Sequence, residues 1–123
     1  MKKLSLALFI SFMALFSNGY THAKEKTILI TGSAGFMGRF FTEYMFKKYK
    51  GYHFILLDNL NYASKKEDIA PEILDSGRCE FIEGSVGDKK LMASLMKRSD
   101  LVVHFAGESD VTRSLIDDEV FFK

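Results

Sequence analysis

The sequence predicts an α/β fold, in which helices flank a parallel sheet. First, short apolar runs suited to strands recur at 27–31, 52–57, 80–83 and 101–105. Second, the segments between them include two that repeat apolar residues at helical spacing, 36–49 and 89–97. Strands that alternate with helices are typical of parallel sheets, because a parallel connection must cross back over the sheet.

A glycine turn joins the first strand to the first helix. Gly32, Gly35 and Gly38 recur at every third position directly after the strand. Gly32 lets the chain turn, Gly35 lets backbone N–H groups approach a pyrophosphate, and Gly38 lets the helix pack closely on the sheet. The start of the helix offers unpaired N–H groups and a positive dipole to phosphates. The turn therefore predicts a dinucleotide site, with an ordinary glycine-rich surface turn as the alternative.

One acid supports the dinucleotide interpretation. Asp58 follows the second apolar run, 20 residues after Gly38. A dinucleotide-binding fold places there the carboxylate that holds the adenosine ribose. The same carboxylate would repel a 2′-phosphate, which favours NAD over NADP, whereas the alternative is an ordinary turn aspartate. Together, the glycines and Asp58 predict the N-terminal half of a Rossmann-like sheet, with its strands in the spatial order 3-2-1-4.

Size and composition narrow the function classes. With 123 residues the chain forms at most one small domain, and its net charge of +1 gives no strong attraction to nucleic acid or to a membrane surface. The single cysteine, Cys79, excludes an internal disulfide and a cysteine-based metal cluster. Because it lies beside an apolar strand, we expect a buried structural thiol. We expect no metal site.

The first 23 residues resemble a secretory signal peptide. Lys2 and Lys3 precede an apolar stretch at 4–16, which is followed by a polar patch at 17–19 and an exit segment that ends in Ala23. The stretch is too short to span a bilayer comfortably, since spanning takes about 20 residues. We expect cleavage after Ala23, with a short retained signal-anchor as the alternative. The chain is then secreted or lumenal if the signal peptide operates, and cytoplasmic otherwise, and residues 24–123 form a partial nucleotide-binding domain.

The remaining elements follow from local signals. The helix at 36–49 is expected to place its Phe and Met side chains in the core and to stop near Gly51. Residues 61–78 are expected to form a loop with short helical turns, interrupted at Pro71. Asp88 is a suitable cap for the helix at 89–97, whose inward residues are expected to be Leu91, Met92, Leu95 and Met96.

The last strand and the histidines complete the chain. The strand at 101–105 is apolar enough to be buried on both faces of the sheet. His104 lies within it and is expected to be a hydrogen-bonded core residue, while His53 is expected at the solvent edge of the second strand. Asp110 or Thr112 is expected to open a final helix.

Three blocks of sequence resemble the extended short-chain dehydrogenases/reductases. They read T-G-S-A-G-F-M-G at 31–38, D-N-L-N-Y-A at 58–63 and H-F-A-G-E-S-D-V-T-R-S at 104–114. The first block resembles the glycine motif of the whole superfamily. The other two are most similar to the nucleotide-sugar dehydratases and epimerases, above all to the thymidine-diphosphate-glucose 4,6-dehydratases. The resemblance covers residues 27–123 and implies NAD as cofactor.

The resemblance also implies which residues hold the cofactor. They come from the glycine turn and from the ends of the second, third and fourth strands: Gly32, Gly35, Phe36, Met37, Gly38, Asp58, Asn59, Leu60, Asn61, Ser85, Val86, Phe105, Ala106, Gly107 and Ser109. Ser109 is also implied to contact substrate. The sequence departs from the family pattern at Ser85-Val86, where relatives usually carry Asp-Ile, and at Asp110 and Thr112.

The family's chemistry needs residues that the sequence does not supply in the right place. The resemblance implies that these enzymes oxidise a hexose hydroxyl with NAD, and that the dehydratases then eliminate water. This chemistry requires a Tyr-x-x-x-Lys pair, whose phenolate acts as base, and an acid/base pair for the elimination. Tyr20 with Lys24 and Tyr44 with Lys48 match the spacing. The first pair precedes the first strand, and the second lies on the first helix, remote from the carboxyl ends of the strands. We assign no catalytic residue.

The expected function is therefore the NAD-binding part of a nucleotide-sugar 4,6-dehydratase, truncated before its catalytic segment. An epimerase fragment and a non-catalytic NAD-binding module are the alternatives. The partners expected for the full-length parent are a nucleotide sugar and a second subunit.

Overall fold

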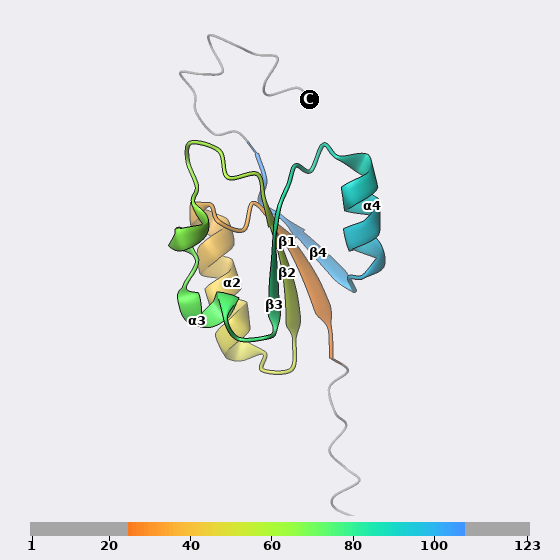
Figure 1. The fold of residues 1–123 in the computed structure, drawn as a ribbon. Coiled ribbons are helices and arrows are strands. Elements are labelled where there is room, and N and C mark those ends of the chain that lie inside the picture. The colour runs from red at the N-terminus through yellow and green to blue at the C-terminus, as the bar shows by residue number, and fades with distance from the viewer. Residues whose placement is uncertain (1–24, 108–123) are drawn as a thin grey trace, which may run out of the picture.

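The computed structural model describes residues 25–107 (Figure 1). Strands and helices alternate, with these bounds: β1 Thr27–Thr31, α2 Phe36–Lys48, β2 His53–Asp58, the 3₁₀ turn η1 Lys66–Asp68, α3 Pro71–Leu74, β3 Cys79–Glu83, α4 Lys89–Lys97 and β4 Leu101–His104. The predicted signal peptide, Ser109 and the predicted final helix lie outside the described residues.

The strands of the described part form one parallel sheet in the order β3-β2-β1-β4, as predicted. Thr31 at the end of β1 pairs with Leu57 of β2 and with His104 of β4. All carboxyl ends therefore lie at one edge of the sheet. The glycine turn, Asp58 and the residues after β4 meet there.

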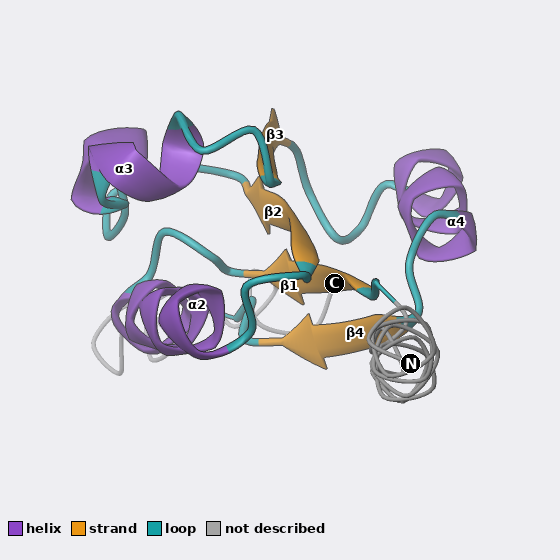
Figure 2. Cartoon of the chain, turned by 90° about the horizontal axis from the view of Figure 1, so that it is seen from below, coloured by secondary structure: helices purple, strands orange, loops and turns teal. Residues whose placement is uncertain are grey.

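Helices cover both faces of the sheet (Figure 2). α2 and α3 lie over one face, where Ile28, Ile30 and Phe54 form the centre of a buried cluster. α4 lies over the other face, where Leu95 packs against Leu29 with its neighbours on β2. The central strand β1 is fully buried at Ile28, Leu29 and Ile30, because each residue faces one of the two helical layers.

The prediction that the Phe and Met side chains of α2 form a core face is wrong for half of them. Of the six, Phe36, Met37 and Phe40 are exposed by 53–68%, and Tyr44 on the same helix is exposed as well. The inward side of the helix carries Gly38 and Thr42, which are buried, together with Phe41, Met45 and Phe46. Apolar residues thus occur on more than one side of α2, and sequence spacing alone does not distinguish the side that faces the sheet.

The strand β4 and the helix α4 are also less buried than predicted. Leu101 and Val102 are 51% and 38% exposed, and His104 is exposed as well. β4 is an edge strand in the described part of the chain, so only β1 covers it laterally. On α4, Leu91, Met92 and Leu95 face the core as expected, but Met96 is 52% exposed.

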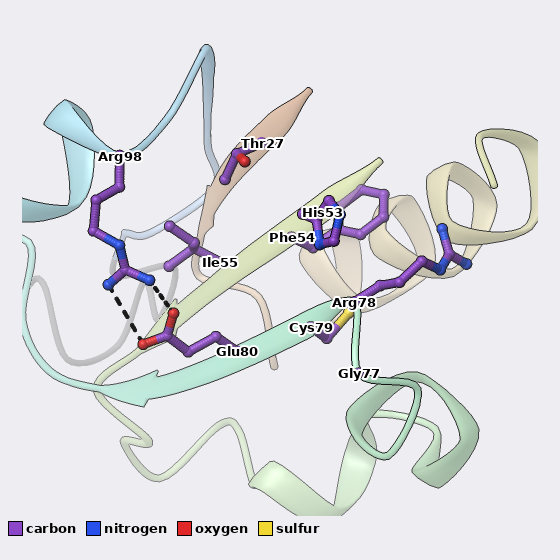
Figure 3. Close-up of a pocket in the computed structure, with 9 residues that line it drawn as sticks. All are labelled: Thr27, His53, Phe54, Ile55, Gly77, Arg78, Cys79, Glu80 and Arg98. Atoms are coloured by element: carbon purple, nitrogen blue, oxygen red, sulfur yellow. Dashed lines mark hydrogen bonds and ion pairs between the residues drawn. The ribbon is translucent and has the colours of Figure 1, made fainter. Parts of the chain in front are cut away.

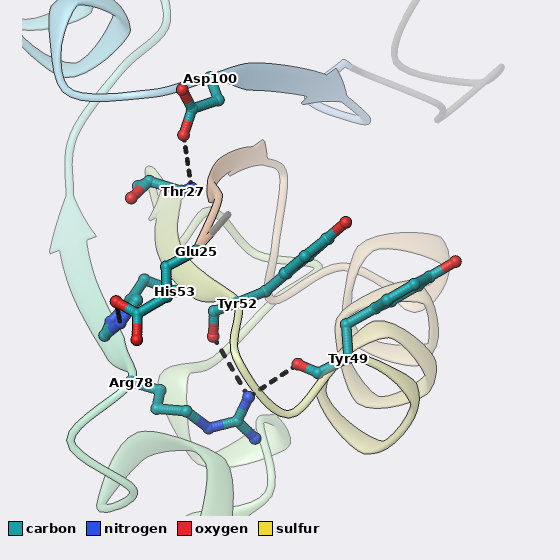
Figure 4. Close-up of polar contacts among 7 residues, drawn as sticks. All are labelled: Glu25, Thr27, Tyr49, Tyr52, His53, Arg78 and Asp100. Carbon is teal, nitrogen blue, oxygen red and sulfur yellow. Dashed lines mark hydrogen bonds and ion pairs between the residues drawn. The ribbon is translucent and has the colours of Figure 1, made fainter. Parts of the chain in front are cut away.

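The end of α2 is closed by a side chain rather than by Gly51. The helix stops at Lys48 with Tyr49 as its cap. The guanidinium of Arg78, directly before β3, donates to the carbonyl oxygens of Tyr49 and Tyr52 at 3.0 and 3.2 Å (Figure 4). It also donates to the carbonyl oxygen of Phe46 at 3.0 Å. It also lies 3.9 Å from the centre of the Phe46 ring. Arg78 therefore ties the end of α2 to β2 and β3.

Cys79, the next residue, is partly buried, and burial raises the pKa of its thiol to about 11. It is therefore a structural thiol with little thiolate at neutral pH, in line with the sequence interpretation. Asp88 caps α4 as predicted, because its carboxylate accepts from the backbone N–H groups of Lys90 and Leu91 at 3.1 and 3.0 Å.

Two glycines allow α2 to approach the end of β1. Gly32 has φ of +66°, and a Cβ there would lie 2.6 Å from the backbone of Phe105 and Ala106. A Cβ at Gly38 would lie 2.0 Å from the carbonyl oxygen of Gly32. Both positions therefore require glycine for the chain's own packing, independently of any ligand.

We expect Gly38→Ala to destabilise the protein by about 3 kcal/mol or more, because a methyl group would have to push the backbone of Gly32 aside. An alanine elsewhere in a helix would stabilise it by about 1 kcal/mol relative to glycine, so the sign itself is diagnostic. Chemical unfolding of the full chain measures the change. Gly51→Ala is the control, since a Cβ at Gly51 meets no atom within 4 Å. Equal stability of the two variants would contradict this packing.

We expect Arg78→Lys to lower the free energy of unfolding by about 2 kcal/mol, because one ammonium group cannot reproduce a planar fork shared by three carbonyls. Arg98→Lys is the control, because Arg98 pairs with Glu80 on the surface, where both side chains are half-exposed (Figure 3). Its free energy of unfolding should fall by no more than about 0.5 kcal/mol. Urea unfolding of both variants tests this, and a loss at Arg98 as large as at Arg78 would refute it.

Candidate functional site

The start of α2 lies at the carboxyl edge of the sheet with no side chain capping it. Gly35 is its cap residue, no side chain accepts from the free N–H groups, and the first turn holds no acid. A Cβ at Gly35 would meet only the Gly32 carbonyl oxygen, at 3.3 Å, so the chain's own packing needs this glycine less than the other two. Phe36 and Met37 are 68% and 62% exposed beside it. The arrangement leaves N–H donors open to an anion.

Asp58 joins the end of β2 to this turn. The residue is only 6% exposed. Oδ2 accepts from the backbone N–H of Ala34, inside the glycine turn, at 2.9 Å. Oδ1 accepts from the backbone N–H of Leu60 at 2.9 Å and from the Ser64 hydroxyl at 3.0 Å. The structure thus brings together the two features that the sequence analysis predicted to share a site.

The loop after Asp58 is folded around the carboxylate. Leu60 has φ of +52°, a strained conformation for a leucine, and its hydrogen bond to Asp58 holds it there. Asn59 is exposed, and Asn61 accepts from the N–H of Ala63 at 3.0 Å. Ser64 was not predicted as a site residue, although it is 7% exposed and bonded to Asp58. Sequence offered no signal for it beyond a serine in a polar loop.

The predicted residues after β3 lie at the same edge. Gly84 follows β3 and donates its N–H to the carbonyl oxygen of Asp58 at 2.9 Å. The Ser85 hydroxyl accepts from the N–H of Gly87 at 3.1 Å, and Val86 is 39% exposed. Ser85 therefore has a local role in its turn, and its O–H remains available as a donor.

The residues after β4 lie against the glycine turn. The N–H of Phe105 donates to the Thr31 carbonyl oxygen at 2.9 Å, and the Phe105–Ala106 peptide packs on Gly32. The Phe105 ring lies 5.4 Å from that of Phe41 on α2. Gly107 follows, and a Cβ added there would meet no described atom within 4 Å. These three predicted residues therefore share the edge with Asp58 and the turn, whereas Ser109 lies outside the described residues.

Other groups lie away from this edge. Tyr44 and Lys48 are in contact, with Nζ donating to the phenol oxygen at 2.9 Å, but both are exposed on α2, remote from the carboxyl edge. A hollow at the opposite end of the strands is lined by His53, Arg78 and Arg98 among others (Figure 3). His53 is exposed there, as predicted, 3.6 Å from Glu25.

Among residues 25–107, no three His, Cys, Asp or Glu side chains are grouped as metal ligands. None of the helices in this part of the chain has the length and apolar character of a membrane span.

Known proteins share both the sequence and the fold. Residues 28–123 match the sequence model of the NAD dependent epimerase/dehydratase family. The dTDP-glucose 4,6-dehydratase of Mycolicibacterium smegmatis is 36% identical over 94 residues, which cover 76% of this chain and 28% of that protein. The chain thus spans less than a third of the curated relatives it matches.

Solved structures of related enzymes show the same similarity in fold. A dTDP-glucose 4,6-dehydratase from Streptomyces venezuelae, with NAD bound, superposes with a TM-score of 0.69 and 37% identity, covering 76% of this chain and 30% of that one. A UDP-glucose 4-epimerase from Thermotoga maritima superposes with a TM-score of 0.63 and 28% identity, covering 76% of this chain and 28% of that one. The order of the strands, the glycine turn and the matched sequence lead to one conclusion: the chain belongs to the NAD-dependent epimerase/dehydratase family.

Proposed function

We propose that the carboxyl edge of the sheet binds the adenosine diphosphate part of NAD, and that the chain is the cofactor-binding part of a nucleotide-sugar 4,6-dehydratase. The observation that carries the proposal is the direct bond between Asp58 and the glycine turn, at 2.9 Å, beside an uncapped helix. An acid beside a set of free N–H donors is the arrangement that a dinucleotide-binding fold uses for the ribose and its phosphates, which supports the proposal.

The residues present fit the cofactor. The free N–H groups at the start of α2 would hold the pyrophosphate, and the exposed side chains of Phe36 and Met37 would cover it. Gly35 would allow the phosphates to approach. Bound NAD would supply the hydride chemistry of the reaction. The residues described here would bind and orient it.

Asp58 would hold the ribose with the one acceptor position that its other hydrogen bonds leave. A carboxylate offers about four acceptor positions, and three are taken by Ala34, Leu60 and Ser64. The remaining position on Oδ2 would accept one ribose hydroxyl. Its charge and burial disfavour a 2′-phosphate, which supports NAD over NADP. Asn59, Leu60, Asn61, Ser85 and Val86 would surround the adenosine, and Phe105, Ala106, Gly107 and Ser109 would lie toward the sugar substrate.

The activity of the whole protein is part of this proposal. Matches to dTDP-glucose 4,6-dehydratases support the dehydratase, and the similarity to UDP-glucose 4-epimerases makes an epimerase the second candidate. A nucleotide sugar would be the substrate. The nucleotide sequence beyond the codon for Lys123 tests this: a frame that encodes Tyr-x-x-x-Lys supports an enzyme, and a stop codon supports a non-catalytic NAD-binding module. Export directed by residues 1–23, and a second subunit, are further parts of the proposal.

We expect Gly35→Ala to weaken NAD binding at least tenfold, because a methyl group at the start of α2 would lie where the pyrophosphate approaches. Calorimetric titration of the full chain with NAD measures this. Gly51→Ala, at the other end of the sheet, should bind like the wild type. Unchanged binding by Gly35→Ala, or no binding of NAD by the folded wild type, would refute the proposed site.

We expect Asp58→Asn to lower the free energy of unfolding by about 2 kcal/mol, since an amide NH₂ would face an N–H donor in place of an acceptor. It should also narrow the preference for NAD over NADP, because the negative charge is lost. Unfolding curves and paired titrations measure both. The control is Asp75→Asn, at an exposed carboxylate that follows α3. A variant with unaltered stability would show that the three hydrogen bonds do not form.

A further inference from the structure

Thr31 and His104 form a side-chain pair that the proposed function does not use. The two residues lie opposite each other in register at the ends of β1 and β4. Thr31 is fully buried and His104 is exposed. Their side chains are in contact, with 2.6 Å between Thr31 Oγ1 and His104 Nδ1.

The donors and acceptors around Thr31 determine which atom carries the proton. The backbone N–H of Ala106 can only donate, and it lies 3.4 Å from Thr31 Oγ1. The hydroxyl oxygen can accept there, but a hydroxyl has two acceptor positions, so its own proton decides the arrangement. Thr31 is fully buried, and among the hydrogen bonds of residues 25–107 the acceptor within reach of its hydroxyl proton is Nδ1 of His104. A proton on Nδ1 would leave the buried O–H without an acceptor, so the favourable arrangement has Nδ1 unprotonated and the ring proton on Nε2.

The peptide that this pair holds is the one that packs on the glycine turn. The Thr31 carbonyl oxygen accepts from the N–H of Phe105, and its hydroxyl from that of Ala106. The same Phe105–Ala106 peptide fills the space that a Cβ at Gly32 would need. One threonine therefore fixes two successive N–H groups at the point where the chain leaves β4 and passes the turn.

We propose that His104 is a positioning residue: as the neutral Nε2–H form it accepts the Thr31 hydroxyl proton, and through Thr31 it fixes the Phe105–Ala106 peptide against Gly32. The proposal extends the proposed function, since that peptide borders the site, but its first tests need no cofactor.

The first test is the protonation of the ring in the wild-type full chain. Nitrogen-15 NMR of labelled histidine at about pH 8, where an ordinary imidazole is neutral, should show Nδ1 unprotonated and Nε2 protonated. His104→Asn assigns the signal among the three histidines of the chain. A proton on Nδ1 of His104 would overturn the proposal.

The second test is hydrogen exchange at the Ala106 amide. Thr31→Val should speed exchange between about two- and tenfold, because the acceptor is lost, while Thr31→Ser should restore the wild-type rate. The Ala106 amide should exchange more slowly in His104→Asn than in His104→Leu, because the asparagine side-chain oxygen can replace Nδ1 as acceptor. His53→Asn is the control, at an exposed histidine at the opposite edge of the sheet. Equal exchange in all variants would overturn the proposal.

The third test separates this inference from the proposed function. If the wild type binds NAD, Thr31→Val should weaken binding by about two- to tenfold and Thr31→Ser should not. If the wild type does not bind NAD, the proposed function fails, while the ring protonation and the exchange rates still decide the role of His104. NAD affinity that is identical in Thr31→Val and the wild type would restrict the pair to a role in the sheet and refute its positioning role at the site.

Discussion

The hydrogen bond between Asp58 and Ala34 is the interaction on which the arrangement of the site depends. It joins the ends of two neighbouring strands across 24 residues of sequence, and both residues are buried. A buried carboxylate is tolerated only where donors surround it, and here three donors do so. The same bonds draw the loop after β2 over the acid and hold Leu60 in a strained conformation. One acid thus shapes both the turn and the loop.

The glycine turn has two separate requirements, and the structure assigns them to different residues. Gly32 and Gly38 are required by close contacts within the protein, because a side chain at either would collide with backbone. Gly35 is under much weaker steric pressure, as its Cβ would meet a single atom at 3.3 Å. A regular spacing of three therefore combines two positions that the protein's own packing requires to be glycine with one where packing requires it less. This distinction cannot be made from sequence alone.

Sequence predicted the elements that follow from periodicity and local chemistry. The sheet order, the helix at Lys89–Lys97 and its cap at Asp88 agree with the prediction. Two kinds of feature could not be predicted from the sequence. One is the exposure of Phe40 and Leu101, which depends on which neighbours cover a face or an edge. The other is contacts between distant segments, such as Ser64 with Asp58 and Arg78 with the end of α2, which no local pattern signals.

Within residues 25–107, β4 is an edge strand, and this has a consequence for what can pair with it. Natural edge strands are commonly protected by lysine, proline or an inward charge, and Leu101–His104 contains no acid, lysine or proline. Its outer N–H and C=O groups are a template that any extended segment can join. A segment of the same molecule that pairs with this edge extends the sheet. A segment of a neighbouring molecule that pairs there instead starts an intermolecular aggregate.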